Sequence, residues 1–341
     1  MVDALGRLVR VLPQSAASEC CRVTDMRNLS VRQRADLALA GGGTTSVWAW
    51  CEEGGAAYCV RGAELIRLGQ GGEQRLLADL SVECVLPPSS TCVGLCPVPD
   101  LSSVLLAMSS GQLLQVATED CGQVEEVGCV QAGIAAIDIS PDLELITLVT
   151  GDLKVITMTR DYLPAQEVSL HETQFGEGEQ VSLGWGRKET QFHGREGKEG
   201  RAAAREQARL EEGDDQRVRV SWRGDGQMFA VSYVVPSVGE ERRCVKVFTR
   251  EGSLYSTSES LAGLCHPMAW RPSGAQVAVV VRQPHRRVVA FLERNGLQHG
   301  EMLLRGEGEV RELAWSCDSQ VGSWSVRLGA SKRRRPSATS V

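Results

Sequence analysis

The sequence predicts an all-β protein, because its apolar residues gather in short runs and helical spacing is almost absent. The chain has 341 residues, of which 42% are hydrophobic and 23% charged, a composition typical of a globular protein with a sizeable core. Val, Ile and Leu cluster in segments such as 104–108, 145–149 and 277–281, and Gly, Asp, Pro and Ser separate these segments. Short β-branched runs bounded by turn residues are typical of β-strands.

One sequence pattern, called the phrase here, recurs along the chain and contains many of these strands. It consists of a strand that ends near a large apolar residue, a tight turn of Asp, Ser, Pro or Gly, and a second apolar strand. Its clear copies are 137–146, 220–231, 268–279 and 313–321. The turn residues reverse the chain, so the second strand of each copy is expected to pair antiparallel with the first.

The period of this phrase predicts the architecture. When weaker copies are included, the large apolar residues lie 37 to 48 positions apart, at Trp50, Cys96, Ile139, Trp185, Trp222, Trp270 and Trp315. Repeats of about 40–45 residues, each with four short strands, indicate a β-propeller of the WD40 kind. The Gly-His and Trp-Asp dipeptides of orthodox WD40 repeats are missing. We therefore predict a WD40-like β-propeller of seven blades, with the last blade truncated.

Three segments fall outside the repeat. Residues 1–25 show no strand period, and we expect them to be an unstructured N-terminal extension. Residues 195–216 are rich in charged residues and Ala, which predicts a solvated loop insertion, with a regulatory loop as the alternative. The apolar strand expected after Gln320 does not follow, so 322–341 is predicted to be a disordered basic tail. The incomplete propeller is therefore expected to span 26–321.

The composition also indicates which kinds of partner and which cellular compartment to expect. The net charge of -6 at pH 7 argues against nucleic-acid binding by the chain as a whole. The 12 Cys are mostly scattered singly through apolar stretches, which is typical of buried thiols in a reducing compartment. No apolar run approaches ~20 residues, so we expect no transmembrane helix and no membrane partner.

These observations favour a cytoplasmic protein. The basic run Lys332, Arg333, Arg334 and Arg335 would add a nuclear location if it acts as a nuclear localisation signal. An incidental basic tail without a function is the alternative.

The residue types that commonly carry catalysis form no recognisable constellation. The sequence contains no G-x-S-x-G elbow and no phosphate-binding P-loop, and its five His are far apart. We therefore predict that the protein is not an enzyme, with no catalytic, cofactor-binding or metal-ligating residue and no cofactor. Trp222, Trp270 and Trp315 could line an aromatic recognition cage, but their equivalent places in the repeat favour core packing.

Several motifs resemble one known family, in the same order along the chain. Gly184–Gly194 reads GWGRKETQFHG, and further motifs lie at 220–232, 269–274 and 291–300. Together they resemble the N-terminal portion of the largest subunit of the Elongator complex. The resemblance covers about residues 26–321 and is strongest from residue 134 onward.

The resemblance implies a fold and a role. The large subunit of this family is a scaffold with two N-terminal propellers and a C-terminal helical-repeat region that dimerises, and this chain would hold only the first propeller. Elongator modifies the wobble uridine of certain tRNAs at its 5-position, giving 5-carbonylmethyl-type products. The chemistry belongs to a different subunit, which carries an iron–sulfur cluster and uses S-adenosylmethionine and acetyl-CoA. The resemblance thus implies a non-catalytic scaffold that lacks the family's homodimerisation region.

The same resemblance implies that the partners are other Elongator subunits and, indirectly, tRNA. Arg187 and Lys188, on the expected turn between two strands, are the residues that we expect to contact a partner. A generic propeller module for protein interaction, whose partner could be nuclear, is the alternative role. Direct RNA binding is a weaker alternative because of the negative net charge.

Overall fold

The structure is a computed structural model, and nearly all of its described residues belong to β-strands or to the turns between them. It describes residues 7–13, 33–39, 45–51, 54–69, 73–119, 122–171, 210–211, 214–235, 241–272, 274, 276–283, 285–304, 309–315 and 322–327. None of the helices in these segments is long and apolar enough to cross a membrane.

Five four-stranded antiparallel sheets, called blades 1 to 5 here, follow one another along the chain. Blade 1 contains β3 (Thr45–Cys51), β4 (Ala56–Arg61), β5 (Glu64–Gly69) and β6 (Gln74–Asp79), and blade 2 contains β7 (Cys92–Val98), β8 (Ser103–Met108), β9 (Gln112–Ala117) and β10 (Val124–Cys129). Blade 3 contains β11 (Ile134–Ile139), β12 (Leu145–Thr150), β13 (Lys154–Thr159) and β14 (Pro164–Ser169). Blade 4 contains β15 (Arg219–Trp222), β16 (Met228–Val235), β17 (Arg242–Thr249) and β18 (Leu254–Thr257), and blade 5 contains β19 (Leu264–Trp270), β20 (Gln276–Gln283), β21 (Arg286–Glu293) and β22 (Gln298–Leu303).

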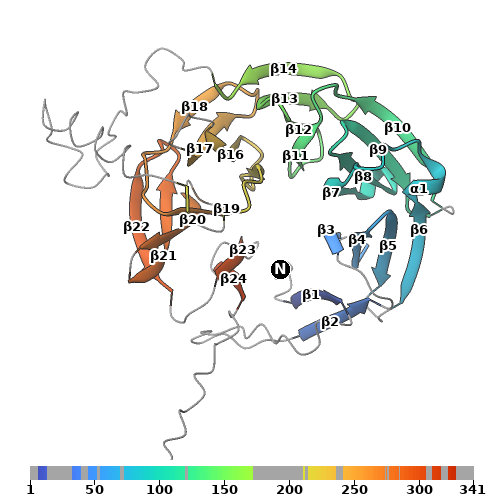
Figure 1. The fold of residues 1–341 in the computed structure, drawn as a ribbon, viewed down its shortest axis with the longest axis horizontal. Helices are drawn as coiled ribbons and strands as arrows, with labels where there is room; N and C mark the ends of the chain where they lie inside the picture. The colour runs from blue at the N-terminus through green and yellow to red at the C-terminus, as the bar shows by residue number, and fades with distance from the viewer. Residues whose placement is uncertain are drawn as a thin grey trace, which may run out of the picture.

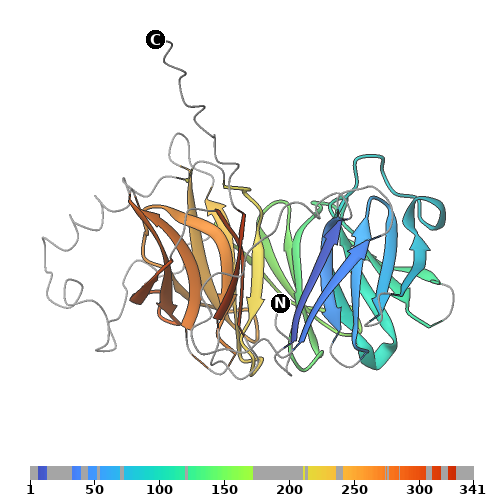
Figure 2. The ribbon, with the colours of Figure 1, turned by 90° about the horizontal axis from the view of Figure 1, so that it is seen from below.

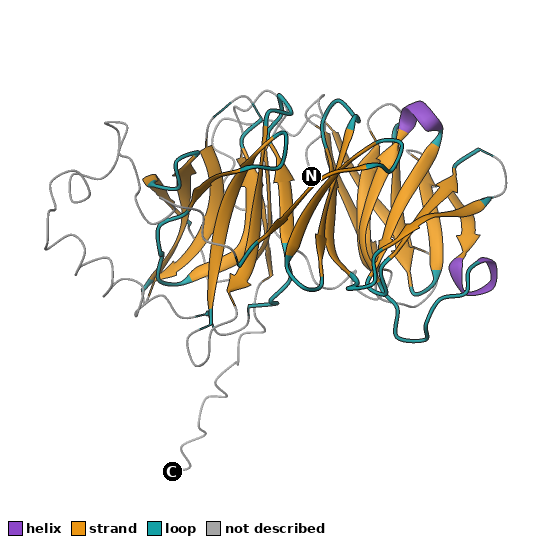
Figure 3. Ribbon diagram, turned by 90° about the horizontal axis from the view of Figure 1, so that it is seen from above, coloured by secondary structure: helices purple, strands orange, loops and turns teal. Residues whose placement is uncertain are grey.

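The remaining elements are smaller. Two strands, β23 (Glu309–Trp315) and β24 (Gly322–Arg327), form an antiparallel pair. Near the N-terminus, β1 (Arg7–Pro13) and β2 (Gln33–Leu39) form a parallel pair. The helical elements are the four-residue α1 (Leu80–Glu83) and the 3₁₀ turn η2 (Pro99–Leu101), which Figure 3 shows at the rims of an otherwise β-stranded body.

The blades are arranged around a common axis, as Figure 1 shows. The first strand of each blade lies innermost, and β3, β7, β11, β15, β19 and β23 are neighbours in this order. The last strands of the blades, such as β14 and β22, lie at the periphery. Seen from the side in Figure 2, the blades form a disc. The prediction of an all-β β-propeller is confirmed.

The predicted number of blades is not confirmed. The described residues form five four-stranded blades and two two-stranded sheets, where seven blades were expected. Trp185, one of the seven predicted anchors, lies outside the described residues. Among the described residues, the inner strands β11 and β15 are direct neighbours.

The two ends of the chain also differ from the prediction. Strand β1 lies within 1–25, which was expected to be unstructured, and β24 lies within 322–341, which was expected to be a disordered tail. Both strands obtain their backbone hydrogen bonds from a neighbour, β2 and β23 respectively.

The recurring turn forms as the sequence predicts. In blade 3 the Ser140 hydroxyl accepts a hydrogen bond from the backbone N–H of Leu145 at 2.9 Å. In blade 4 the Asp225 carboxylate accepts from the backbone N–H of Gln227 at 3.0 Å. Short polar side chains of this kind stabilise a tight turn by bonding to the backbone nearby. The turns therefore reverse the chain between the first and second strand of a blade, which sets the antiparallel register.

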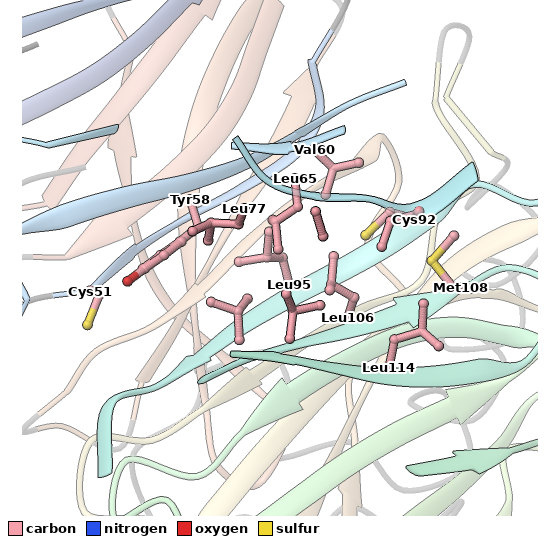
Figure 4. Packing of buried hydrophobic residues seen from close by; sticks show 14 of the residues in the cluster. Cys51, Tyr58, Val60, Leu65, Leu77, Cys92, Leu95, Leu106, Met108 and Leu114 are labelled. Atoms are coloured by element: carbon pink, nitrogen blue, oxygen red, sulfur yellow. The ribbon is translucent and has the colours of Figure 1, made fainter. Parts of the chain in front are cut away.

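Apolar side chains from neighbouring blades close the seams between them. Figure 4 shows the cluster between blades 1 and 2, in which Tyr58 and Leu65 meet Leu95 and Leu106. At the next seam the inner strands approach so closely that a Cβ atom added to Gly94 would lie 2.1 Å from Cγ2 of Ile137. Burial of these faces is the main stabilising contribution that the described strands share.

Candidate functional site

The residues predicted to contact partners lie outside the described residues. Arg187 and Lys188 lie between blades 3 and 4 in the sequence, and Lys332, Arg333, Arg334 and Arg335 follow β24. Their roles stay predictions.

The three Trp anchors belong to the propeller body. Trp222 and Trp270 are buried, at 8% and 3% exposure, and Trp315 is half-buried. The indole N–H of Trp270 donates to the carbonyl of Gly274 at 3.1 Å, and that of Trp315 donates to the carbonyl of Ala269 at 3.3 Å. The indole nitrogen of Trp222 is buried and has no hydrogen-bond partner among the described residues. All three rings are enclosed, at least in part, by the propeller body, as core packing requires. The prediction of core packing is confirmed.

The residues before two of the anchors, Ile139 and Trp222, link one blade to the next. Asp138 Oδ2 in β11 accepts a hydrogen bond from the backbone N–H of Trp222 in β15 at 3.3 Å. Ser221 Oγ in β15 accepts from the backbone N–H of Trp270 in β19 at 3.1 Å. The repeat therefore places a short polar side chain where it satisfies a backbone donor of the following blade, which fixes the position of neighbouring inner strands.

Asp138 is the more unusual member of this pair. Burial raises the pKa of Asp138 to about 7, although backbone N–H groups of Ile139 and Trp222 oppose the shift. Removal of the carboxylate from water disfavours its charged form. Asp138 therefore changes its charge near neutral pH at a point where two blades meet.

A second polar feature is a cluster of charged residues at the edge of blade 4 that faces blade 5. We call Asp214, Asp215, Arg219, Arg243 and His266 the junction cluster. The Arg243 and Asp214 side chains are both 0% exposed. Arg243 donates from Nε and Nη2 to the Asp214 carboxylate, at 2.8 and 2.5 Å. Such a bidentate pair is the strongest form of side-chain ion pair.

Arg243 uses its other guanidinium nitrogen as well. Nη1 donates to the carbonyl of Arg217 and to the hydroxyl of Ser232, both at 3.1 Å. The guanidinium therefore ties the segment before β15 to strands β16 and β17. The expectation that residues 195–216 form a solvated loop stays a prediction; among the few of these residues that the structure describes, the Asp214 side chain is buried against Arg243, whereas Asp215 and Gln216 are exposed.

Asp215 and Arg219 form the outer pair of the junction cluster. Arg219 Nη1 and Nη2 donate to the two Asp215 oxygens at 3.0 and 2.6 Å, and both side chains are partly exposed. Burial alone would raise the pKa of Asp215, but the hydrogen bonds and the charge of Arg219 outweigh it and hold the pKa at about 2. Asp215 is therefore ionised throughout the physiological range.

His266 in β19 completes the junction cluster from blade 5. It is 8% exposed, and its ring forms no hydrogen bond with the described residues. Burial lowers the pKa of His266, and the positive charges of Arg219 and Arg243 add to this effect while Asp215 and Asp214 oppose it. The imidazole is therefore neutral at neutral pH.

The sequence offered no signal for the junction cluster. Asp214 and Asp215 follow Glu211, Glu212 and Gly213, a run that suggests a solvated loop. The buried partner of Asp214 is Arg243, 29 residues further along the chain. Because His266 is neutral, the two carboxylates and two guanidiniums balance, so the junction cluster carries no net charge with which to attract nucleic acid.

Exposed ion pairs connect the blades at the rim formed by the recurring turns. Arg250, in the turn between β17 and β18, contacts Asp142 and Glu144 in the turn between β11 and β12, both at 2.7 Å. Arg250 Nη1 also donates to the carbonyl of Gly226 at 3.0 Å. Blades 3 and 4 are therefore held both near the axis, through Asp138, and at this rim.

Comparison with known proteins gives this architecture a family. A family model described as the ELP1 first N-terminal beta-propeller matches residues 26–328. The match extends beyond the predicted boundary at residue 321 and includes all of β24.

Several relatives carry one name. Elongator complex protein 1 from Oryctolagus cuniculus is 42% identical over 236 residues, which are 68% of this chain and 18% of that protein. Elongator complex protein 1 from Saccharomyces cerevisiae is 34% identical over 237 residues, which are 58% of this chain and 17% of that protein. The chain thus spans less than a fifth of the length of these relatives. Because the family model matches residues 26–328, which are most of this chain, the chain belongs to the family of the first N-terminal β-propeller of Elongator complex protein 1.

Proposed function

We propose that this chain acts as a non-catalytic scaffold subunit of the Elongator complex and supports modification of the wobble uridine of tRNA. Family membership over residues 26–328 is the observation that carries the proposal. The relatives from rabbit and from yeast are both named as a protein of the Elongator complex. A subunit name of this kind supports a role within an assembly.

The features of the described residues support a structural role. The inner-strand links join one blade to the next, and the junction cluster holds the segment before β15 to strands β16 and β17 of blade 4. A propeller stabilised in this way offers its rims and turns as rigid surfaces for other chains. We propose that other Elongator subunits bind these surfaces and that contact with tRNA is indirect.

Arg187 and Lys188 are proposed to contact one of these subunits. Both lie in the GWGRKETQFHG motif, which the family model includes. We further propose a cytoplasmic location, with nuclear import as the role of Lys332 to Arg335.

Co-purification tests the proposal. The tagged 341-residue chain is expressed in cells, and proteins bound to it are identified by mass spectrometry, with a tagged full-length relative as the positive control. We expect the chain to recover other Elongator subunits. Recovery of none of them, while the full-length relative recovers them, would show that this chain is not a working component.

A pair of variants tests the contact residues. We expect Arg187→Ala/Lys188→Ala to reduce recovery of at least one subunit. The matched control is Lys154→Ala/Arg160→Ala, which removes two partly exposed positive charges from blade 3 and should leave recovery unchanged. Equal recovery by both variants would remove Arg187 and Lys188 from the proposed interface.

A further inference from the structure

The junction cluster contains a buried side chain whose ring nitrogens no other described residue uses. His266 is 8% exposed, and one ligand atom each from His266, Asp214 and Asp215 lie within 4.8 Å of one another. An imidazole with carboxylates is a donor set that Zn²⁺ binds, whereas Ca²⁺ and Mg²⁺ prefer oxygen ligands alone. We propose that Asp214, Asp215 and His266 form a Zn²⁺ site, and that the Arg219 guanidinium takes the place of Zn²⁺ in the metal-free chain.

The geometry requires a small contraction. Bonds from Zn²⁺ to nitrogen and oxygen are about 2.0–2.2 Å, so the ligands of a tetrahedral ion lie ~3.3 Å apart. The three donor atoms therefore close by up to ~1.5 Å when the ion binds. Asp215 makes this movement, because its side chain is partly exposed. Asp214 and His266, which are buried, form the fixed side of the site.

The two arginines of the junction cluster have different roles in this proposal. Arg243 is 0% exposed and donates to the inner carboxylate, that of Asp214, so it stays in place and orients this ligand. Arg219 lies at the exposed edge, where it donates to Asp215 and to the carbonyl of Arg217. Its long side chain can turn into solvent and keep its charge hydrated. Zn²⁺ and Arg219 therefore compete for the same carboxylate.

The balance of charge supports this competition. With Arg219 in place, the two carboxylates and two guanidiniums sum to zero. When Arg219 leaves, Asp214, Asp215 and Arg243 carry a net charge of -1, which favours a divalent cation. His266 would bind the ion through a ring nitrogen of the neutral imidazole, and no described residue occupies these nitrogens with a hydrogen bond. A water molecule would complete the tetrahedral set.

Zn²⁺ binding would change what the junction cluster connects. Arg243 ties the segment before β15 to strands of the same blade, whereas His266 lies in β19 of blade 5. A bound ion would therefore join blade 4 to blade 5 directly. Occupancy of the site would stabilise the folded chain by mass action.

Metal titration of the full 341-residue chain tests the proposal. The chain is stripped with a chelator, Zn²⁺ is added in competition with a chromophoric chelator, and thermal unfolding is followed with and without Zn²⁺. We expect one tight site and a rise in the melting temperature. Loss of a partner that merely orients a metal ligand weakens binding by about 10–100-fold, so His266→Gln, which removes a ligand, should weaken it by at least about tenfold.

Arg219→Ala gives the sharper result. Because it removes the competing cation, this variant should bind Zn²⁺ severalfold more tightly than the wild type, although it loses an ion pair. The matched control is Arg223→Ala, which removes a similar bidentate pair with Asp225 in a turn outside the junction cluster and should leave the affinity unchanged. A cluster with a purely structural role would show no tightening in either variant.

Cysteines are the main alternative ligands, since the chain has 12 of them. The Co²⁺-loaded chain should show no intense thiolate-to-metal absorption in the near ultraviolet. Equal Zn²⁺ affinity of wild type and His266→Gln, or a thiolate spectrum, would overturn the proposal. If His266→Gln fails to fold by circular dichroism, Asp215→Asn replaces it, and unchanged affinity of this second variant has the same consequence.

Discussion

The seam between blades 2 and 3 is packed by apolar side chains, whereas charged residues lie beside the apolar packing between blades 4 and 5. At the first, Gly94 and Ile137 bring two inner strands into close contact, and apolar side chains such as Leu105 and Leu148 fill the space between the blades. At the second, an apolar cluster that includes Val247 and Val279 lies beside the junction cluster, whose ion pairs belong to blade 4 and which His266 of blade 5 adjoins. The comparison teaches that one fold uses two kinds of joint, which fail for different reasons.

An apolar seam is sensitive to volume, because protein interiors are packed to the density of organic crystals. A buried ion pair loses its stability when one partner is removed, because the remaining buried charge is then uncompensated. An added methyl group at the apolar seam should therefore lower the unfolding free energy. In the junction cluster, the loss of one charged group should lower the unfolding free energy, whereas the loss of both charges of a pair should change it little.

The largest expected effect is at Arg243. Arg243→Met leaves the Asp214 carboxylate buried without its partner, and breaking a buried pair in this way costs about 3–5 kcal/mol of unfolding free energy. Denaturant unfolding measures the loss. The double variant Arg243→Met/Asp214→Leu replaces both charges and should recover most of it. If the double variant is as unstable as the single one, completeness of the pair is not what the junction cluster requires.

Asp138 adds a dependence on pH to the seam between blades 3 and 4. Burial raises its pKa in the folded chain to about 7, above the ordinary value of 3.8, so between these two pH values the folded chain holds a proton that the unfolded chain has released. The stabilising contribution is therefore complete below pH 3.8 and is lost as pH rises to about 7. A pKa difference of this size between the folded and unfolded chains corresponds to at most about 4 kcal/mol.

Asp138→Asn tests this contribution, because the Asn side chain does not titrate. We expect the stability of the variant relative to the wild type to rise steadily from about pH 4 to 7 and to stay level at higher pH. Denaturant unfolding at a series of pH values measures the difference. Parallel curves for the two proteins across this range would show that Asp138 is not a buried titrating group.

The apolar seam is tested at Gly94. The added Cβ of Gly94→Ala would lie 2.1 Å from Ile137 Cγ2, so the inner strands must move apart, at a cost of about 1–3 kcal/mol. The double variant Gly94→Ala/Ile137→Ala removes the clashing methyl group. Coupling between the two substitutions in a double-mutant cycle would confirm the contact, whereas additive losses would contradict it.

The sequence predicts the apolar joints better than the ionic one. The anchors Trp222 and Trp270 were identifiable because the repeat places them at equivalent positions, and both are buried as expected. The direct contact of β11 with β15 was not predictable, because the period assigned a blade to Trp185. The period of the sequence indicates the length of a blade, but it does not show whether every copy of the pattern forms one.

The junction cluster was missed for a related reason. Charged residues in an acidic run are usually solvated, and no local signal distinguishes Asp214 from its neighbours. The burial of Asp214 depends on Arg243, which lies beside it because β17 pairs antiparallel with β16. Pairing of distant charges is a property of the tertiary structure, so a sequence without a structure gives no access to it.

The smallest expected effect is at the rim, where Arg250 bridges Asp142 and Glu144. The Asp142 and Glu144 carboxylates are 42% and 68% exposed, so water and salt screen their attraction to Arg250, and such pairs contribute about 0–1 kcal/mol. Arg250→Ala should therefore lower the unfolding free energy only slightly, and less at high salt than at low salt. Arg250→Lys, which keeps the charge but not the planar donor fork, is the matched control. A loss as large as that of Arg243→Met would show that the rim, and not the buried charge, carries the ionic stabilisation of blade 4.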